Sequence, residues 1–302
     1  MSASAELPFV AAPPGDLESV TRSAELAAGN WGFAAPEFLR MGMNGIFAAG
    51  DGVLLRVSRP TAPPEQAIWL AGVLTRFGLR VPTYLRDQPF VTDDHAVFAI
   101  GAVVERGPVD WTAVGEMIAR LHRLDRSEVA PGYPLPFCGD FPWWSFASMI
   151  TEVGADLDSV SRGGIDAAIA RCLPLLTEQR AISSLVCHGD VHPGNVIQSA
   201  DGPVLLDWDL LCRGPAAWDH APLLTWTQRW GGEPGIYEAF AEGYGSSLRG
   251  DAVAEAIAEL RLVAATLMRV RAARASPSAA DEAELRLRYW RGEADSPMWR
   301  AQ

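Results

Sequence analysis

Short runs of hydrophobic residues in the first third of the chain predict β-strands. The runs at 53–57 and 95–100 are rich in aliphatic and aromatic residues, as is typical of strands. Between them, residues 65–77 carry apolar side chains at helical spacing, and Pro63 and Pro64 mark the start of that helix. This part of the chain therefore predicts a small sheet accompanied by one helix.

After about residue 107 the spacing of apolar residues becomes helical. Residues 111–124 and 251–275 each place their apolar residues on one helix face. One β-rich segment, 185–212, interrupts the helices, and Asp201-Gly202 within it is a strong hairpin signal. The expected organisation is an N-terminal lead-in over 1–24, a β-rich N-lobe over 25–101 and a helical C-lobe over 102–302.

Composition narrows the class of protein. The chain has 302 residues and a formal net charge of −12, which argues against nucleic acid or an anionic membrane as a partner and mildly favours a cationic substrate. No apolar run approaches the length of a membrane span, so a soluble, cytoplasmic protein is expected. All 25 residues counted as lysine or arginine are arginine, which excludes chemistry that needs a lysine, such as a Schiff base.

The densest group of polar residues is H-G-D-V-H-P-G-N at 188–195, followed by D-W-D at 207–209. Asn195 begins the first strand of the predicted hairpin and Asp207 ends the second, so the turn should bring them together. An amide oxygen beside a carboxylate suits Mg²⁺. Asp190 then remains available to accept a proton from an attacking hydroxyl.

This pair of motifs resembles the catalytic and metal loops of the aminoglycoside phosphotransferase family, small-molecule kinases of the protein-kinase-like superfamily. The resemblance implies a bilobal α+β fold with a small β-rich N-lobe and a larger helical C-lobe. It makes Asp190 the catalytic aspartate and Asn195 and Asp207 the Mg²⁺ ligands. His188 and Asp219 would give structural support to the site.

The N-lobe resembles the family less closely. Asn44-Gly45 lies in a segment similar to a shortened glycine-rich loop over the nucleotide phosphates. The following strand offers Arg56 where kinases have a lysine, and Glu65 is the expected ion-pair partner of this arginine. An arginine can neutralise a phosphate, although its planar fork differs from a lysine ammonium.

The resemblance implies transfer of the γ-phosphoryl group of ATP or GTP to a hydroxyl of a small molecule. Val103 and Val104 would bind the purine through backbone groups, whereas Asp209, Trp226 and Trp230 would contact the acceptor. A cationic acceptor is expected: an aminoglycoside, another antibiotic or an amino-alcohol. Two alternatives stay open, namely a metabolic kinase of the choline, homoserine or sugar kind, and a catalytically silent nucleotide-binding module.

Overall fold

The computed structural model describes residues 13–60, 62–129, 133–182, 185–274, 276–294 and 296–300. These residues form two compact units. The first unit takes its residues from 1–110, 124–135 and 193–211, and the second from 111–123, 136–192 and 212–302.

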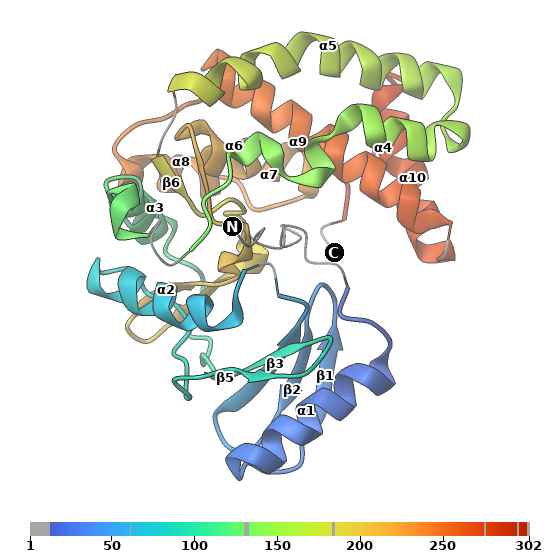
Figure 1. The fold of residues 1–302 in the computed structure, drawn as a ribbon. Helices are drawn as coiled ribbons and strands as arrows, with labels where there is room; N and C mark the ends of the chain where they lie inside the picture. Colours follow the sequence, from blue (N-terminus) through green and yellow to red (C-terminus); the bar gives the residue numbers. More distant parts are fainter. Residues whose placement is uncertain are drawn as a thin grey trace, which may run out of the picture. The chain divides into compact units, whose positions relative to one another are not determined.

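The first unit is built on an antiparallel sheet in the strand order β1-β2-β3-β5-β4 (Figure 1). Its strands are β1 (Glu37–Met41), β2 (Gly45–Ala48), β3 (Val53–Ser58), β4 (Phe90–Val91) and β5 (Ala96–Gly101). The strands expected at 53–57 and 95–100 are thereby confirmed as β3 and β5. Their pairing sets Arg56 opposite Phe98.

Helix α1 (Leu17–Trp31) packs on this sheet and begins inside the segment 1–24 that was expected to be a lead-in. Asp16 caps the helix by accepting a hydrogen bond from the backbone of Ser19, as N-cap residues do. Val20 and Ala24 of α1 are fully buried in the same hydrophobic core as Phe47 and Leu55 of the sheet. Helix α1 is therefore an integral part of this unit.

The predicted helix at 65–77 is α2 (Pro64–Arg76), and the predicted hairpin is formed by β7 (Val196–Ser199) and β8 (Gly202–Leu205). The hairpin belongs to the first unit although it comes late in the sequence. Backbone hydrogen bonds attach it there, because Arg106 donates to Gln198 and Leu205 donates to Arg80. Asp207 and Asp209, which follow the hairpin, therefore share a unit with β3.

The second unit is helical, and its long helix α9 packs against α5, α10, α6 and α4 (Figure 1). A short strand pair, β6 (Leu185–Cys187) with β9 (Cys212–Gly214), lies among the helices. The helices are α3 (Trp111–Leu121), α4 (Phe146–Val153), α5 (Ser159–Ile182), α6 (Ala217–Leu224), α7 (Trp226–Trp230), α8 (Ile236–Tyr244), α9 (Ala252–Ala273) and α10 (Pro277–Trp290). The helices expected at 111–124 and 251–275 are confirmed as α3 and α9.

Two glycines allow α3 and α8 to pack closely. A Cβ atom added to Gly115 would lie 2.0 Å from the carbonyl oxygen of Phe240, and one added to Gly243 would lie 1.8 Å from that of Thr112. No side chain fits at such distances, so each helix presents a glycine to the backbone of the other. This contact joins the start of α3 to the end of α8, whose last residue is Tyr244.

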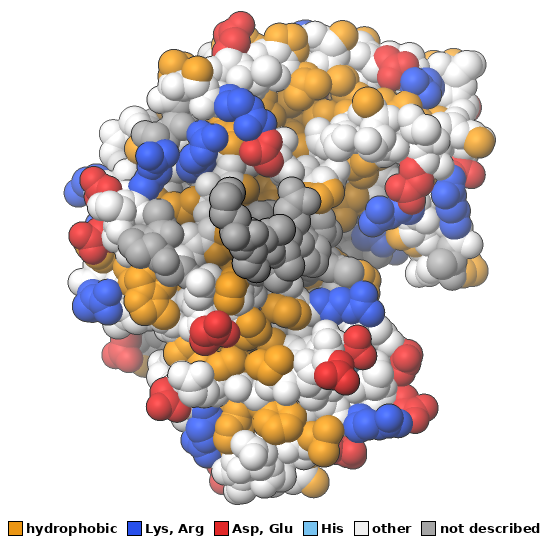
Figure 2. Space-filling model, viewed as in Figure 1, with side chains coloured by type: hydrophobic (Ala, Val, Ile, Leu, Met, Phe, Trp, Pro, Cys, Tyr) orange, Lys and Arg blue, Asp and Glu red, His pale blue; other side chains and the backbone are white. Residues whose placement is uncertain are grey.

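On one face of the molecule, charged side chains of both signs lie near one another (Figure 2). On the face that Figure 2 shows, arginine side chains lie beside acidic ones, in keeping with exposed ion pairs such as that of Arg162 with Asp166. Within the described ranges, no helix is long and apolar enough to cross a membrane.

Candidate active site

Arg56 of β3 pairs with the two aspartates of the D-W-D segment at 207–209. Its Nη2 atom forms a close ion pair with Asp209 and lies 3.7 Å from Oδ1 of Asp207. Burial alone would lower the pKa of Arg56, but the charges of Asp209 and Asp207 raise it. Glu65 is exposed, and no ion pair joins it to Arg56 in the described part of the chain. The expected Arg56–Glu65 pair is therefore replaced by pairs with residues about 150 positions away.

The D-W-D segment at 207–209 has an unusual backbone. Asp207 has a φ of 57°, and it is the one non-glycine residue with positive φ among those described. Leu206 donates a backbone hydrogen bond to the carbonyl of Asn195 at 2.8 Å, so the hairpin joins the two segments as expected. The Asp207 side chain is 40% exposed. The backbone segments of Asn195 and Asp207 are therefore neighbours, and an amide with a carboxylate offers oxygen ligands of the kind that Mg²⁺ binds.

The other nucleotide-site candidates of the first unit lie in β2 and after β5. Gly45 has a packing role, because a Cβ atom there would lie 2.5 Å from a methyl group of Val20. The Oδ1 atom of the neighbouring Asn44 is buried and has no hydrogen-bond partner among the described residues. Val103 and Val104 follow the last residue of β5, and Val104 is exposed.

The loop that carries Asp190 lies in the second unit and contains several charged contacts. One oxygen of Asp190 forms a close ion pair with Arg261, and the other lies 3.3 Å from Nε2 of His192. Burial acts to raise the pKa of Asp190, but the charges of His192, Arg261 and His188 hold it well below its usual range. The carboxylate is therefore ionised at neutral pH, and its contacts with Arg261 and His192 fix its orientation.

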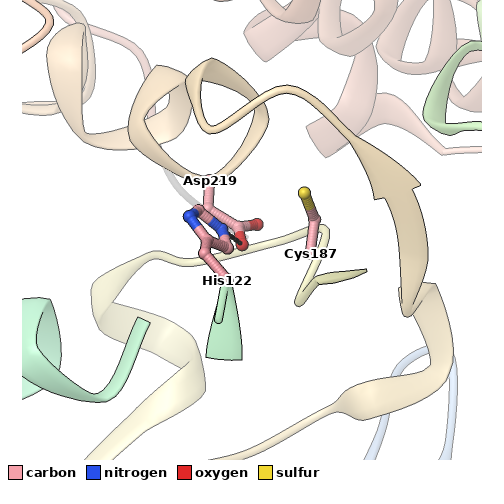
Figure 3. Close-up of side chains that lie close together, drawn as sticks. All are labelled: His122, Cys187 and Asp219. Atoms are coloured by element: carbon pink, nitrogen blue, oxygen red, sulfur yellow. Dashed lines mark hydrogen bonds and ion pairs between the residues drawn. The ribbon is translucent and has the colours of Figure 1, made fainter. Parts of the chain in front are cut away.

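The buried Asp219 carboxylate fixes the backbone of this loop. Its Oδ2 atom accepts a 2.9 Å hydrogen bond from the backbone of His188, and its Oδ1 atom accepts a 2.8 Å bond from that of Gly189. Oδ2 also lies 3.0 Å from Nε2 of His122, whose other ring nitrogen bonds to the hydroxyl of Tyr244. Figure 3 shows the His122 ring and the Asp219 carboxylate directed toward each other.

Cys187 completes a buried cluster with His122 and Asp219, and one ligand-type atom from each residue lies within 4.8 Å of the others (Figure 3). Burial raises the pKa of the Cys187 thiol far above its usual range, so the sulfur stays protonated. Both oxygens of Asp219 are already engaged by N–H groups. The cluster is thus a hydrogen-bonded support for the loop that carries Asp190 and is poorly suited to a metal.

A cavity of about 570 Å³ opens beside Asp190 within the second unit. Trp226 and Trp230 line it, as sequence reasoning expected of acceptor residues. Asp209 is not among its lining residues and is paired with Arg56. Four arginines line the cavity, whereas Asp190 is its one acidic residue in the described part of the chain. The overall negative charge favours a cationic acceptor, but the lining of this cavity carries more positive than negative side chains.

Arg261 is the residue of this site that sequence reasoning missed. It lies in the predicted helix 251–275, and besides pairing with Asp190 it donates a 3.1 Å hydrogen bond to the carbonyl of Gly189. No local motif marks it, since it is 71 residues from Asp190 in sequence. In the sequence, its helical spacing to Ala265 and Met268 was the one feature that could have placed it on the same face of α9 as other cavity residues.

Comparison with known proteins identifies the class of this protein. The model of the phosphotransferase enzyme family, abbreviated APH, matches residues 48–260. This range covers well over half of the chain and contains both motifs, and the chain belongs to this family. A search of curated proteins finds no significant match.

Solved structures of low sequence identity share the fold. They include the GDP and kanamycin complex of the aminoglycoside phosphotransferase APH(2″)-IIIa (14% identity, TM-score 0.67, 92% of this chain and 100% of that chain). The spectinomycin phosphotransferase APH(9)-Ia with ADP and spectinomycin is also similar (14% identity, TM-score 0.60, 87% of this chain and 90% of that chain). A third is the macrolide 2′-phosphotransferase MphH from Brachybacterium faecium (17% identity, TM-score 0.54, 88% of this chain and 97% of that chain). The kinase-like fold class expected from the sequence is confirmed.

Proposed function

We propose that this phosphotransferase is an Mg²⁺-dependent small-molecule kinase that transfers the γ-phosphoryl group of ATP or GTP to an acceptor hydroxyl oriented by Asp190. The observation that carries the proposal is the position of Asp190. Its ionised carboxylate lines a 570 Å³ cavity, on a loop whose backbone is bonded to the buried Asp219.

Asn195 and Asp207 would hold Mg²⁺, which neutralises charge on the nucleotide phosphates during phosphoryl transfer. Asn195 follows Asp190 by five residues, so the proposed metal ligand and the proposed catalytic carboxylate belong to one short segment of the sequence. Arg56 would supply the second cation for the phosphates, taking the place of a kinase lysine.

Val103 and Val104 are suited to bind the purine. Within the described ranges, neither residue forms a backbone hydrogen bond, whereas the neighbouring Ala102 donates to Gly52 and Arg106 donates to Gln198. Free N–H and C=O groups at this point can pair with the edge of a base. Structures of similar fold contain GDP or ADP, which supports a nucleotide donor and does not distinguish ATP from GTP.

Asp190 has to supply only part of the rate enhancement, through orientation of the acceptor hydroxyl and transfer of its proton. Proton transfer and orientation by a positioned carboxylate contribute about 10²- to 10⁴-fold to a rate. Asp190 would accept a hydrogen bond from the acceptor hydroxyl and aim its oxygen at the γ-phosphorus. As the new P–O bond forms, the bond from the γ-phosphorus to the β,γ-bridging oxygen breaks, the nucleoside diphosphate leaves and Asp190 takes the hydroxyl proton. A carboxylate of low pKa serves orientation better than early proton abstraction, consistent with the loose transition state of phosphoryl transfer.

The test is incubation of the protein with ATP or GTP, Mg²⁺ and a panel of hydroxyl compounds, with phosphorylated product detected by mass spectrometry. The panel contains aminoglycosides, a macrolide, amino-alcohols, simple sugars and sugar acids. Product that requires both Mg²⁺ and Asp190 supports the proposal. Nucleotide binding without transfer to any acceptor would contradict it and favour a silent nucleotide-binding module.

A further inference from the structure

We infer that the acceptor carries an anionic group, a carboxylate or phosphate, together with a flat apolar face, and that it is not a polycation. This inference rests on the proposed function and specifies the acceptor of the same site. It follows from the lining of the cavity beside Asp190, which combines one aromatic wall with one arginine-bearing wall.

The arginine-bearing wall is one face of α9. The lining residues Arg261, Leu262, Ala265, Met268 and Arg269 follow a spacing of one, four, seven and eight residues, which places them on a single helical stripe. Arg271 and Arg286 add two further cations to the lining. A polycationic acceptor would bring its ammonium groups against these guanidinium groups without a line of carboxylates to receive them.

The four arginines differ in how far their charge is already neutralised. Arg261 is paired with Asp190, and the buried Arg286 bonds to Glu282 at 3.0 Å. Arg271 lies 3.6 Å from Glu152.

Arg269 is different. It is half-buried and lines the cavity, yet no ion pair or hydrogen bond to its side chain occurs among the described residues. A half-buried guanidinium without a carboxylate favours an anionic ligand, which it can bind through two parallel hydrogen bonds.

The aromatic wall of the cavity already contacts a cation of the protein itself. The rings of His192 and Trp226 are nearly parallel with centroids 5.4 Å apart, and those of Trp226 and Trp230 are 6.0 Å apart. The guanidinium of Arg286, which also lines the cavity, lies 5.0 Å from the centroid of Trp230. The protein's own arginine thus occupies a cation–π position on this wall, so the wall is better suited to a flat neutral ring.

The spacing along α9 sets the length of the acceptor. Arg261 marks the position of Asp190, and Arg269 is eight residues further along the helix. A rise of 1.5 Å per residue separates the two positions by ~12 Å. The acceptor should therefore present its anionic group roughly that far from the reacting hydroxyl.

A matched set of three probes tests this inference. The 4-carboxyphenyl, 4-methylphenyl and 4-(aminomethyl)phenyl β-D-glucopyranosides share a flat ring and sugar hydroxyls and differ in charge, which is negative, neutral and positive in turn. Dissociation constants are measured by calorimetry for the wild type, Arg269→Glu, Arg269→Gln and the surface control Arg162→Glu.

We expect the wild type and Arg162→Glu to bind the carboxyphenyl glucoside about tenfold more tightly than the aminomethyl compound, as for a charge-assisted bidentate contact. Arg269→Glu should reverse the order, and Arg269→Gln should bring the three constants within about threefold. Tighter or equal binding of the aminomethyl compound by the wild type, no binding of any of the three, or an unchanged order in Arg269→Glu overturns the inference.

A parallel assay separates failure of the inference from failure of the proposed function. If kanamycin is phosphorylated in an Asp190-dependent reaction while the charge order fails, the acceptor class is wrong and the kinase proposal survives. If the charge order holds but no hydroxyl compound is phosphorylated, the cavity selects anions as inferred and the kinase proposal fails.

Discussion

The guanidinium of Arg56 lies 3.7 Å from the carboxylate of Asp207 and closer still to that of Asp209. One arginine in the sheet therefore contacts two carboxylates of the loop that follows the β7–β8 hairpin. The Arg56 side chain is only 14% exposed, so these pairs are partly protected from solvent and salt. The cation proposed for the phosphates thus has a fixed position before any nucleotide binds.

The first prediction concerns the fork of Arg56. Arg56→Ala should raise the KM for nucleotide and lower kcat, with a loss of about 100-fold in kcat/KM. Arg56→Lys should lose about tenfold, because an ammonium is a compact point charge and cannot offer a phosphate the two parallel N–H donors of a guanidinium. Steady-state kinetics with varied nucleotide measures both effects. The exposed Arg59→Ala is the matched control, and a larger loss in that variant would show that the phosphate cation had been assigned to the wrong arginine.

The second prediction distinguishes the two aspartates of the loop. Asp207→Ala should raise the Mg²⁺ concentration needed for half-maximal nucleotide binding at least about tenfold, because it removes a proposed ligand. Asp209→Ala should change that concentration by less than about threefold and act through Arg56, raising the KM for nucleotide. Titration of Mg²⁺ at fixed nucleotide separates the two effects. Equal shifts for the two variants, or a dominant effect of Asp209, would contradict the assignment of the metal ligand.

The third prediction is a pH dependence of stability caused by His220. This side chain is fully buried, and mainly that burial lowers its pKa from 6.5 to about 4. Between these values the unfolded chain binds more protons than the folded chain, so the free energy of unfolding decreases as the pH falls from 6.5 to 4. The contribution of this one group is about 3 kcal/mol at most.

Urea unfolding at several pH values measures the effect. His220→Phe keeps an aromatic ring beside Phe240 and Tyr244, which His220 contacts edge-to-face, and removes the titrating group. The slope between pH 4 and 6.5 should be clearly smaller in this variant. An unchanged slope would show that His220 does not cause the pH dependence.

The fourth prediction tests the close packing of α3 and α8. Gly243→Ala should destabilise the fold by about 1–3 kcal/mol, as overpacking does, because its methyl group would collide with the carbonyl of Thr112. Gly163→Ala in α5 is the matched control, since no atom lies within 4 Å of a Cβ added there. That change should stabilise the helix by up to about 1 kcal/mol. Equal denaturation midpoints for the two variants would contradict the close contact.

The sequence predicts most of the local structure because local structure depends on neighbouring residues. Hydrophobic spacing located α3 and α9, and Asp201-Gly202 located the hairpin, within a few residues of where the structure has them. The start of α1 was missed because small residues and prolines precede it. Its burial depends on contacts with strands far along the chain.

The partners of the site residues were less accessible to sequence reasoning. Glu65 was the nearest plausible partner of Arg56, but Asp209, 153 residues away, takes that place. The arginines of the cavity come from α9 and α10, and a net charge of −12 does not indicate that they gather there. Net charge averages over the whole surface, whereas an acceptor experiences only the few side chains within reach.

Single-turnover transfer from labelled nucleotide by Asp190→Asn tests the central claim most directly. This substitution keeps the size of the side chain and removes its charge. With an acceptor that the wild type phosphorylates, we predict a rate at least about 100-fold lower, as for loss of a positioned general base. The affinity for nucleotide should stay within about threefold of the wild type, because Asp190 is proposed to contact the acceptor alone. Transfer at the wild-type rate by Asp190→Asn would contradict the account.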